Sequence, residues 1–202
     1  MPSPLYSSIA VVSWPVLRGL FRLEAHGVEN LPEGGFVLAA NHFSNFDPWP
    51  LGLPLFPSRQ LFFMAKAELF NPILGPPLRA GGAFPVRRGE ADVEAVQRAV
   101  EICRSGGVVA MFPEGTRERK GLRKKFEHKP RTGSARIALN AGVPLVPAAL
   151  EGTDRLSRLA KLKVSYGEPV PVDDLKGRSH GEAHKVATQR LMERISSLRE
   201  AL

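Results

Sequence analysis

Short apolar runs that alternate with helical patterns are the feature that most constrains how this chain can fold. The helical patterns and the strand-like runs are separated by turn residues rather than by long polar linkers. Strands that alternate with helices in this way are typical of βαβ units. The sequence therefore predicts an α/β fold: a single domain with a largely parallel central sheet flanked by helices. The predicted strands are residues 36–41, 60–65, 107–112, 144–150 and 161–166, and the predicted helices are 91–104, 132–141 and 182–201.

The length and composition fit one domain of this kind. The chain has 202 residues, of which 43% are hydrophobic and 24% charged, as is ordinary for a globular protein. The single cysteine, Cys103, excludes an intramolecular disulfide and fits a reducing compartment. Because Cys103 follows Val96 and Val100 at helical spacing, we expect it to pack in the core rather than act as a nucleophile.

The first 22 residues form a pattern of their own. Arg18 and Arg22 follow a mostly apolar stretch that is too short and too interrupted for a membrane span. An apolar helix followed by basic residues can lie in a membrane interface, with Trp14 and Arg18 as contacts, or it can pack on the domain core. We expect an amphipathic N-terminal helix at residues 1–22, ahead of a main domain at residues 23–202. Its apolar stripe is Leu5, Ile9, Val12, Val16 and Leu20.

Positive charge is concentrated in one segment. The net charge of the chain is +8, and residues 117–131 hold eight Lys and Arg against two Glu. Such a cluster favours an anionic partner, namely a phosphate group, a membrane surface, nucleic acid or an acidic protein, although a solvated loop without a partner fits as well. Lys124 and Lys125 are the predicted contacts. Only Phe126 is aromatic there, so we expect no nucleic-acid partner.

A histidine and a carboxylate follow the predicted strand at 36–41. His42 and Asp47 are five residues apart in the run Asn-His-Phe-Ser-Asn-Phe-Asp-Pro. Imidazole can take and return a proton near neutral pH, and a nearby carboxylate can fix its tautomer and stabilise the imidazolium. A structural interpretation is also open, in which Asp47 caps a helix that starts at Pro48 and His42 is a loop residue.

A second polar turn follows the predicted strand at 107–112. The run Phe-Pro-Glu-Gly-Thr-Arg ends in Glu114, Gly115, Thr116 and Arg117. A guanidinium beside a hydroxyl and free backbone N–H groups can hold a phosphate, although the run can also be a plain charged turn. Because functional groups gather at the carboxyl ends of parallel strands, we expect this turn to lie near the histidine.

Two weaker motifs complete the set. In the run from Gly82 to Gly89, Arg87 and Arg88 are adjacent, so in an extended segment at most one of them points into a given cleft. The apolar run at 142–148 contains two prolines and is either a pocket lining or plain core. Pro147 has no N–H, which predicts that its strand lies at a sheet edge or carries a bulge.

Other classes of site find no support in the sequence. There is no Gly-rich nucleotide-binding loop and no Gly-x-Ser-x-Gly elbow. The histidines at 128, 180 and 184 have no grouping with Cys or carboxylates that would make a zinc site. We therefore expect no bound metal.

Taken in order, these segments resemble the glycerolipid acyltransferase family, most closely the bacterial 1-acyl-sn-glycerol-3-phosphate acyltransferases. The run from Asn41 to Asp47 is similar to the family's His-x4-Asp block. A further run, from Phe63 to Leu69, is similar to a family segment between the first two blocks. The second block of the family often has an acidic residue before its arginine, where this chain has Arg87. The remaining three blocks correspond to residues 82–89, 112–117 and 143–147.

The resemblance implies transfer of a fatty acyl group from an acyl thioester to the free hydroxyl of lysophosphatidic acid, giving phosphatidic acid in phospholipid biosynthesis. It makes residues 23–202 the catalytic domain, His42 the general base and Asp47 the group that orients it. The implied phosphate contacts are Arg88, Glu114, Gly115, Thr116 and Arg117, with Lys66 and Arg87 as further candidates. The implied acyl or acceptor pocket is lined by Val143, Pro144, Val146 and Pro147.

The resemblance also implies the partners. The donor substrate is acyl-CoA or acyl-acyl carrier protein, with no bound cofactor, and the acceptor is a lysophospholipid. The enzyme is expected to be peripheral, at the cytoplasmic face of the cell membrane, where the basic segment would meet anionic lipid or an acyl carrier protein. Two alternatives stay open: acylation of glycerol 3-phosphate or another lysolipid, and a non-catalytic peripheral membrane-binding protein.

Overall fold

The computed structural model describes residues 2–87, 92–115 and 130–202, and within them one seven-stranded sheet forms the centre of the molecule. The strand order is β1-β7-β6-β2-β5-β3-β4, and every neighbouring pair is parallel except β6 and β7. The strands are β1 (Glu24–His26), β2 (Phe36–Ala40), β3 (Leu61–Lys66), β4 (Ala83–Val86), β5 (Val108–Met111), β6 (Leu145–Glu151) and β7 (Lys163–Tyr166).

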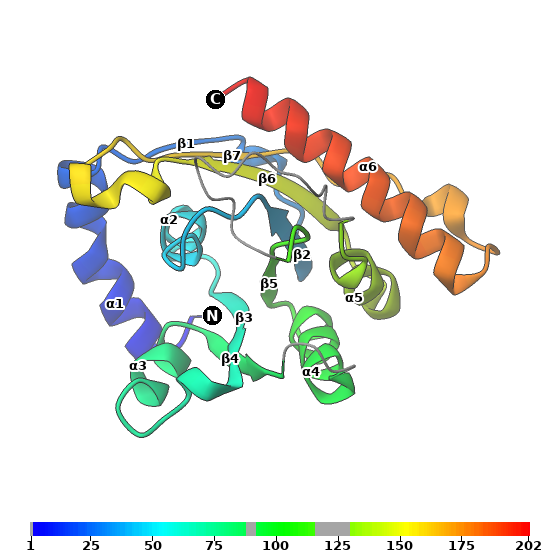
Figure 1. Ribbon diagram of the computed structural model, residues 1–202, viewed down its shortest axis with the longest axis horizontal. Coiled ribbons are helices and arrows are strands. Elements are labelled where there is room, and N and C mark those ends of the chain that lie inside the picture. The colour runs from blue at the N-terminus through cyan, green and yellow to red at the C-terminus, as the bar shows by residue number, and fades with distance from the viewer. Residues whose placement is uncertain (1, 88–91, 116–129) are drawn as a thin grey trace, which may run out of the picture.

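Helices cover both faces of this sheet (Figure 1). One face carries α1 (Pro4–Pro15) and α2 (Pro48–Gly52), and the other carries α4 (Val93–Arg104), α5 (Gly133–Ala141) and α6 (His180–Glu200). The short helix α3 (Gly75–Ala80) connects β3 to β4. One π-helical turn, Val16–Leu20, extends α1, and 3-10 turns occur at Val28–Asn30, Leu53–Leu55, Ala67–Leu69, Thr153–Arg158 and Asp173–Leu175. The predicted α/β fold with a largely parallel sheet is confirmed.

The sequence of β2 is a continuous apolar run, without the alternation of apolar and polar residues that a half-buried strand shows. Leu38 packs in the hydrophobic cluster under α1 and α2, whereas Val37 and Ala39 pack in the cluster under α4, α5 and α6. All five residues of β2 are fully buried. A strand covered by helices on both faces needs apolar side chains on both, so the alternation disappears.

The strand β6 corrects one expectation. Pro147 was predicted to place its strand at an edge or a bulge, but β6 lies inside the sheet, between β7 and β2. The carbonyl of Pro147 accepts a hydrogen bond from the N–H of Gly167, so this residue presents its backbone to the β7 side. The last paired residue of β7 is Tyr166. The missing N–H therefore falls opposite Gly167, one residue beyond the last ladder pair, so the proline removes a bond only at the end of the ladder.

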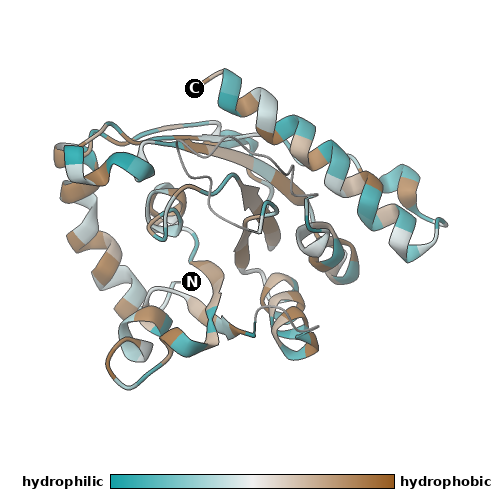
Figure 2. Ribbon diagram, viewed as in Figure 1, coloured by the Kyte–Doolittle hydropathy of each residue, from teal (hydrophilic) through white to brown (hydrophobic). Residues whose placement is uncertain are grey.

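The N-terminal helix is present, and it is apolar on two sides. Ala10, Leu17 and Phe21 pack in the core cluster beneath the sheet. The predicted stripe, by contrast, faces solvent, with Val12 and Leu20 among its exposed members. The colouring of Figure 2 shows apolar residues along this helix. The division into residues 1–22 and 23–202 stays a prediction, and the helix shares its core with the rest of the domain.

None of the helices in the described part of the chain has the length and apolar character needed to cross a membrane.

Candidate active site

The site begins where β2 ends. Asn41, the first residue after the strand, is fully buried and bonds Leu150 of the neighbouring strand twice. Its amide Nδ2 donates to the Leu150 carbonyl at 3.0 Å, and its Oδ1 accepts from the Leu150 N–H at 2.9 Å. The side chain thus continues the sheet ladder by one step, which fixes the point at which the next residue, His42, leaves the sheet.

His42 is bonded to Asp47, as the sequence predicts. The His42 Nδ1 and Asp47 Oδ2 atoms are 2.6 Å apart, and the histidine side chain is 11% exposed while the aspartate is fully buried. The same oxygen accepts the N–H groups of Phe43 at 2.8 Å and Ser44 at 3.0 Å. One carboxylate oxygen therefore organises the imidazole and the loop that carries it.

The interpretation in which Asp47 caps the following helix is wrong in one respect. The helix α2 starts at Pro48, as predicted, but the Asp47 side chain makes no capping bond to it. The reason is that its Oδ2 points back to His42 and to the preceding N–H groups. The other oxygen, Oδ1, is buried and has no hydrogen-bond partner among the described residues. The carboxylate is thus committed to the histidine loop rather than to α2.

This geometry decides which ring nitrogen of His42 can act. An ionised carboxylate only accepts hydrogen bonds, so the 2.6 Å contact requires Nδ1 to be the donor. In the neutral imidazole, the lone pair then lies on Nε2. No residue in the described part of the chain is recorded in hydrogen bonding with Nε2. His42 is therefore arranged as a general base with Asp47 behind it.

The turn after β5 lies directly beside the histidine. The ring of Phe112 stacks on the imidazole of His42, with 4.2 Å between centroids and 19° between planes. The turn closes with a hydrogen bond from the N–H of Gly115 to the carbonyl of Phe112, and Gly115 has a φ of +71°. The strand-end motifs that the sequence placed apart are thus brought together, as expected for neighbouring parallel strands.

A basic side chain that sequence reasoning did not single out packs on this turn. The N–H of Arg131 donates to the carbonyl of Pro113 at 2.8 Å. The Nε of Arg131 lies 2.5 Å from where a Cβ on Gly115 would be, so a larger residue there would displace the Arg131 side chain, and the positive φ of Gly115 itself favours glycine. Within residues 2–87, 92–115 and 130–202, no hydrogen bond or ion pair is recorded for this guanidinium.

The remaining predicted phosphate, membrane and carrier-protein contacts fall into three groups. Lys66 ends β3, exposed and two strands away from β2, or roughly 10 Å at the usual strand spacing. Glu114 is half-buried in the turn after β5. Five predicted residues lie outside the described residues: Arg88, Thr116, Arg117, Lys124 and Lys125.

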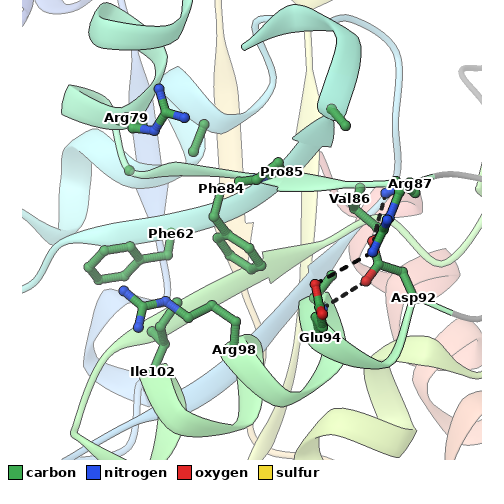
Figure 3. A pocket seen from close by; sticks show the side chains of 14 residues that line it. Phe62, Arg79, Phe84, Pro85, Val86, Arg87, Asp92, Glu94, Arg98 and Ile102 are labelled. Atoms are coloured by element: carbon green, nitrogen blue, oxygen red, sulfur yellow. Dashed lines mark hydrogen bonds and ion pairs between the residues drawn. The ribbon is translucent and has the colours of Figure 1, made fainter.

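Arg87 lies at the other end of the same sheet edge, at one end of a surface pocket of about 640 Å³ (Figure 3). Its guanidinium approaches Asp92 Oδ2 at 3.7 Å and Glu94 Oε2 at 3.5 Å. The pKa of Asp92 is lowered, first by the backbone N–H of Arg87, then by that of Ala95 and by the charge of Arg87. Arg87 thus links the end of β4 to the start of α4. The strand β4 is three strand spacings, or ~14 Å, from β2.

The structure does not gather the predicted acyl-pocket residues into one cavity. Val146 is in the cluster under α1 and α2, while Val143 packs against the cluster on the opposite face. The carbonyl of Pro144 accepts from Val37 at the amino end of β2, roughly 16 Å along the strand from His42. Pro147 is buried within β6. Their role in substrate binding stays a prediction.

No group of three or more His, Cys, Asp or Glu side chains that could hold a metal occurs among the residues the structure describes. Cys103 is buried, as expected, and burial raises its pKa to about 12. It is thus a core residue on α4 rather than a nucleophile.

A histidine bonded to a buried carboxylate thus lies beside the turn after β5, on which Arg131 packs. Residues 22–151, which contain all of these features, match the family model described as Acyltransferase. This match spans more than half of the chain, so the protein belongs to the acyltransferase family.

Individual relatives support the same assignment. The chain is 33% identical over 191 residues to the 1-acyl-sn-glycerol-3-phosphate acyltransferase of Bacillus subtilis (strain 168), which covers 92% of both proteins. It is 28% identical over 182 residues to the enzyme of the same name from Streptococcus pneumoniae (strain ATCC BAA-255 / R6), covering 87% of this chain and 65% of that protein. The crystal structure of the 1-acyl-sn-glycerophosphate (LPA) acyltransferase PlsC from Thermotoga maritima is similar, with a TM-score of 0.66 and 28% identity over 96% of this chain and 78% of that one.

Proposed function

We propose that this protein transfers a fatty acyl group from an acyl thioester to the free hydroxyl of lysophosphatidic acid, giving phosphatidic acid. The observation that carries the proposal is the 2.6 Å contact between His42 Nδ1 and Asp47 Oδ2, which leaves Nε2 available at the carboxyl edge of the sheet. The relatives named 1-acyl-sn-glycerol-3-phosphate acyltransferases support the choice of acceptor. Membership of an acyltransferase family argues against the non-catalytic alternative.

In the proposed reaction, His42 Nε2 removes the hydroxyl proton as the oxygen attacks the thioester carbonyl. Collapse of the tetrahedral intermediate breaks the carbon–sulfur bond, and the departing thiolate takes the proton back from the imidazolium. Asp47 stabilises the positive ring between these two transfers. General-base catalysis of this kind contributes about 10²- to 10⁴-fold. Direct attack is favoured because no Ser or Cys in the motifs stands out as a nucleophile, and Cys103 is buried in the core.

The phosphate of the acceptor needs a cation close to His42. In lysophosphatidic acid, the free hydroxyl is on the carbon next to the one that bears the phosphate. The turn after β5 is therefore better placed than Lys66, two strands away, or Arg87, which is engaged with Asp92 and Glu94. We assign the phosphate to Arg131 together with the predicted Arg117, while Arg88, which also lies outside the described residues, stays a prediction. Holding this anion would align the hydroxyl with the base.

Membrane attachment is supported by the N-terminal helix. Its apolar stripe faces solvent, and the Arg18 guanidinium lies 5.6 Å from the centre of the Trp14 ring at the surface. An exposed aromatic ring with a cation on it suits the boundary between apolar chains and anionic head groups. The proposed location is the cytoplasmic face of the membrane, where basic residues meet anionic lipid.

The acceptor and the donor are tested together with purified protein. Lysophosphatidic acid, glycerol 3-phosphate and lysophosphatidylcholine would each be offered with acyl-CoA and with acyl-acyl carrier protein. The proposal expects labelled phosphatidic acid from the first acceptor with at least one donor. Preferential acylation of either other acceptor would replace the proposed substrate, and absence of transfer to all three would refute the proposal.

A further inference from the structure

The segment between β3 and α3 exposes apolar side chains that the sequence analysis did not single out. Ile73 is 83% exposed, and Leu74 and Leu69 are 47% and 41% exposed. Residues 69–78 contain no charged side chain. Isolated exposed apolar residues are ordinary on proteins, but three in one uncharged surface segment indicate an interaction site.

Local hydrogen bonds hold this segment in shape. Asn71 Oδ1 accepts from the N–H of Ile73 at 3.0 Å and of Leu74 at 2.8 Å. The carbonyl of Asn71 accepts from the N–H of Gly75 at 2.8 Å, which joins the turn to α3. The Arg79 guanidinium lies 5.0 Å from the centre of the Phe70 ring. The apolar tip at Ile73 is thus fixed in an outward position.

The topology puts this tip at the same sheet edge as His42. The strands β2 and β3 are both parallel to β5, so the segments that follow them lie at the carboxyl edge. Phe46, in the His42 loop, is also exposed there. The outward stripe of the N-terminal segment ends with Leu20, four strand spacings from β3, because the next residue, Phe21, bonds the backbone of Leu162 just before β7. Since β7 runs opposite to β6, its start is at the carboxyl edge as well.

We propose that residues 69–74 insert into the head-group region of a membrane leaflet and, with α1, hold the carboxyl edge of the sheet against the lipid. This inference rests on the proposed function, because a lipid acceptor must reach His42 from a leaflet. A bilayer with anionic lipid is the fitting partner. The tip protrudes instead of forming a groove, and exposed basic residues flank the surface: Arg18, Lys66 and Arg79.

A single fluorescent label tests the position of the tip. Cys103 is 1% exposed, so a thiol-reactive, environment-sensitive probe will report on an introduced cysteine. The variants are Ile73→Cys and, as a control, Val28→Cys. Val28 is 38% exposed and follows β1, which runs opposite to β2 and so ends at the amino edge. The labelled proteins would be mixed with phosphatidylcholine vesicles, with and without phosphatidylglycerol.

The proposal expects a blue shift of emission at position 73 with anionic vesicles and none at position 28. Absence of a shift at 73, whether or not the protein sediments with vesicles, overturns the proposal, and so does an equal shift at 28. As a second measure, Ile73→Asp should weaken vesicle binding at least tenfold, because it removes the isoleucine side chain that is proposed to insert into the lipid. The control Val28→Asp should not weaken binding. Equal binding by wild type and Ile73→Asp also overturns the proposal.

The two proposals can fail separately. Transfer to a short-chain, water-soluble lysophosphatidic acid should be the same in wild type and Ile73→Asp, because the segment does not contact His42 in the proposed reaction. If wild type transfers no acyl group while the label at 73 still shifts, the proposed function fails and the membrane contact stands. If transfer is normal and the label does not shift, only the membrane inference fails.

Discussion

At the scale of single residues, the site depends on one oxygen atom. Asp47 Oδ2 takes the hydrogen bond of the imidazole and those of two backbone N–H groups. The aspartate therefore has a chemical role and a structural role, and a variant that removes the whole carboxylate removes both. An amide keeps an oxygen at this position but not the negative charge.

We expect Asp47→Asn to keep the fold and to lose activity. Its oxygen can still accept from Phe43 and Ser44, so the melting temperature should fall by only a few degrees. The imidazolium loses its counter-charge, and in a comparable triad this substitution costs about 10⁴-fold in kcat. Thermal unfolding and acyl-transfer kinetics measure the two effects, with Asp47→Ala expected to lower both. Full activity in Asp47→Asn would contradict the orienting role.

Arg131 gives a second prediction at this scale. Arg131→Ala should raise KM for lysophosphatidic acid about 10- to 100-fold, the range expected when one charge-assisted hydrogen bond is lost. Arg131→Lys should restore part of the affinity, because it keeps the charge but not the planar fork. Arg136→Ala, which removes an exposed arginine of α5, is the matched control. An unchanged KM in Arg131→Ala would remove this residue from the acceptor site.

The sequence predicted the pairing of His42 with Asp47 but not the surroundings of the pair. His42 and Asp47 are close in the chain and belong to a recognisable block, so their bond could be predicted. The contacts of Asn41 with Leu150 and of Phe112 with His42 join distant segments. Arg131 was one of eight basic residues in its segment, and only its packing on Gly115 distinguishes it.

At the scale of elements, the two faces of the N-terminal helical segment, α1 and the π-helical turn after it, make different contributions, one to stability and the other to the proposed membrane contact. Leu17→Ala should lower the free energy of unfolding by about 2 to 5 kcal/mol, because Leu17 is fully buried in the core cluster. Leu20→Ala, on the exposed stripe, should change it by less than about 0.5 kcal/mol but weaken vesicle binding. Chemical denaturation measures the change in the free energy of unfolding, and vesicle sedimentation measures the change in membrane binding. Equal destabilisation by both changes would contradict the assignment of the faces.

The start of α4 should show a pH-dependent contribution from Asp92. Its pKa is lowered below the ordinary 3.8, so the ionised form is favoured in the folded protein. The resulting stability is present above about pH 4 and is lost as the pH falls through the lowered pKa. Asp92→Asn should therefore melt below wild type at pH 7, and the difference should shrink in acid. A difference that stays constant between pH 7 and pH 2 would exclude this electrostatic origin.

The elements that the sequence predicted are those whose pattern is long and regular. The runs that became β2, β3, β5 and β6 were predicted because both faces of each strand pack in the core and stay apolar, whereas β7 alternates, with Val164 and Tyr166 buried. The strands β1 and β4 were missed because β1, Glu24–His26, has only one apolar residue and β4, Ala83–Val86, contains a proline. The position of Pro147 inside the sheet depends on where its neighbour β7 ends, which no local pattern reveals.

At the scale of the molecule, the parallel arrangement assembles the site. The strands β2, β5, β3 and β4 all end at one edge, so motifs separated by tens of residues meet there. The same edge carries the protruding segment at 69–74 and the end of the α1 stripe. The proposed base, the turn after β5 and the proposed lipid contact therefore lie at one edge, as a reaction on a membrane lipid requires.

The central claim is that His42 removes the proton of a lysophosphatidic acid hydroxyl. The most direct test measures labelled phosphatidic acid formed from lysophosphatidic acid and an acyl thioester by wild type and by His42→Ala, with folding of both checked by thermal unfolding. We predict product with wild type and a rate at least about a hundredfold lower with a folded His42→Ala variant. Equal rates for the two proteins would contradict the claim.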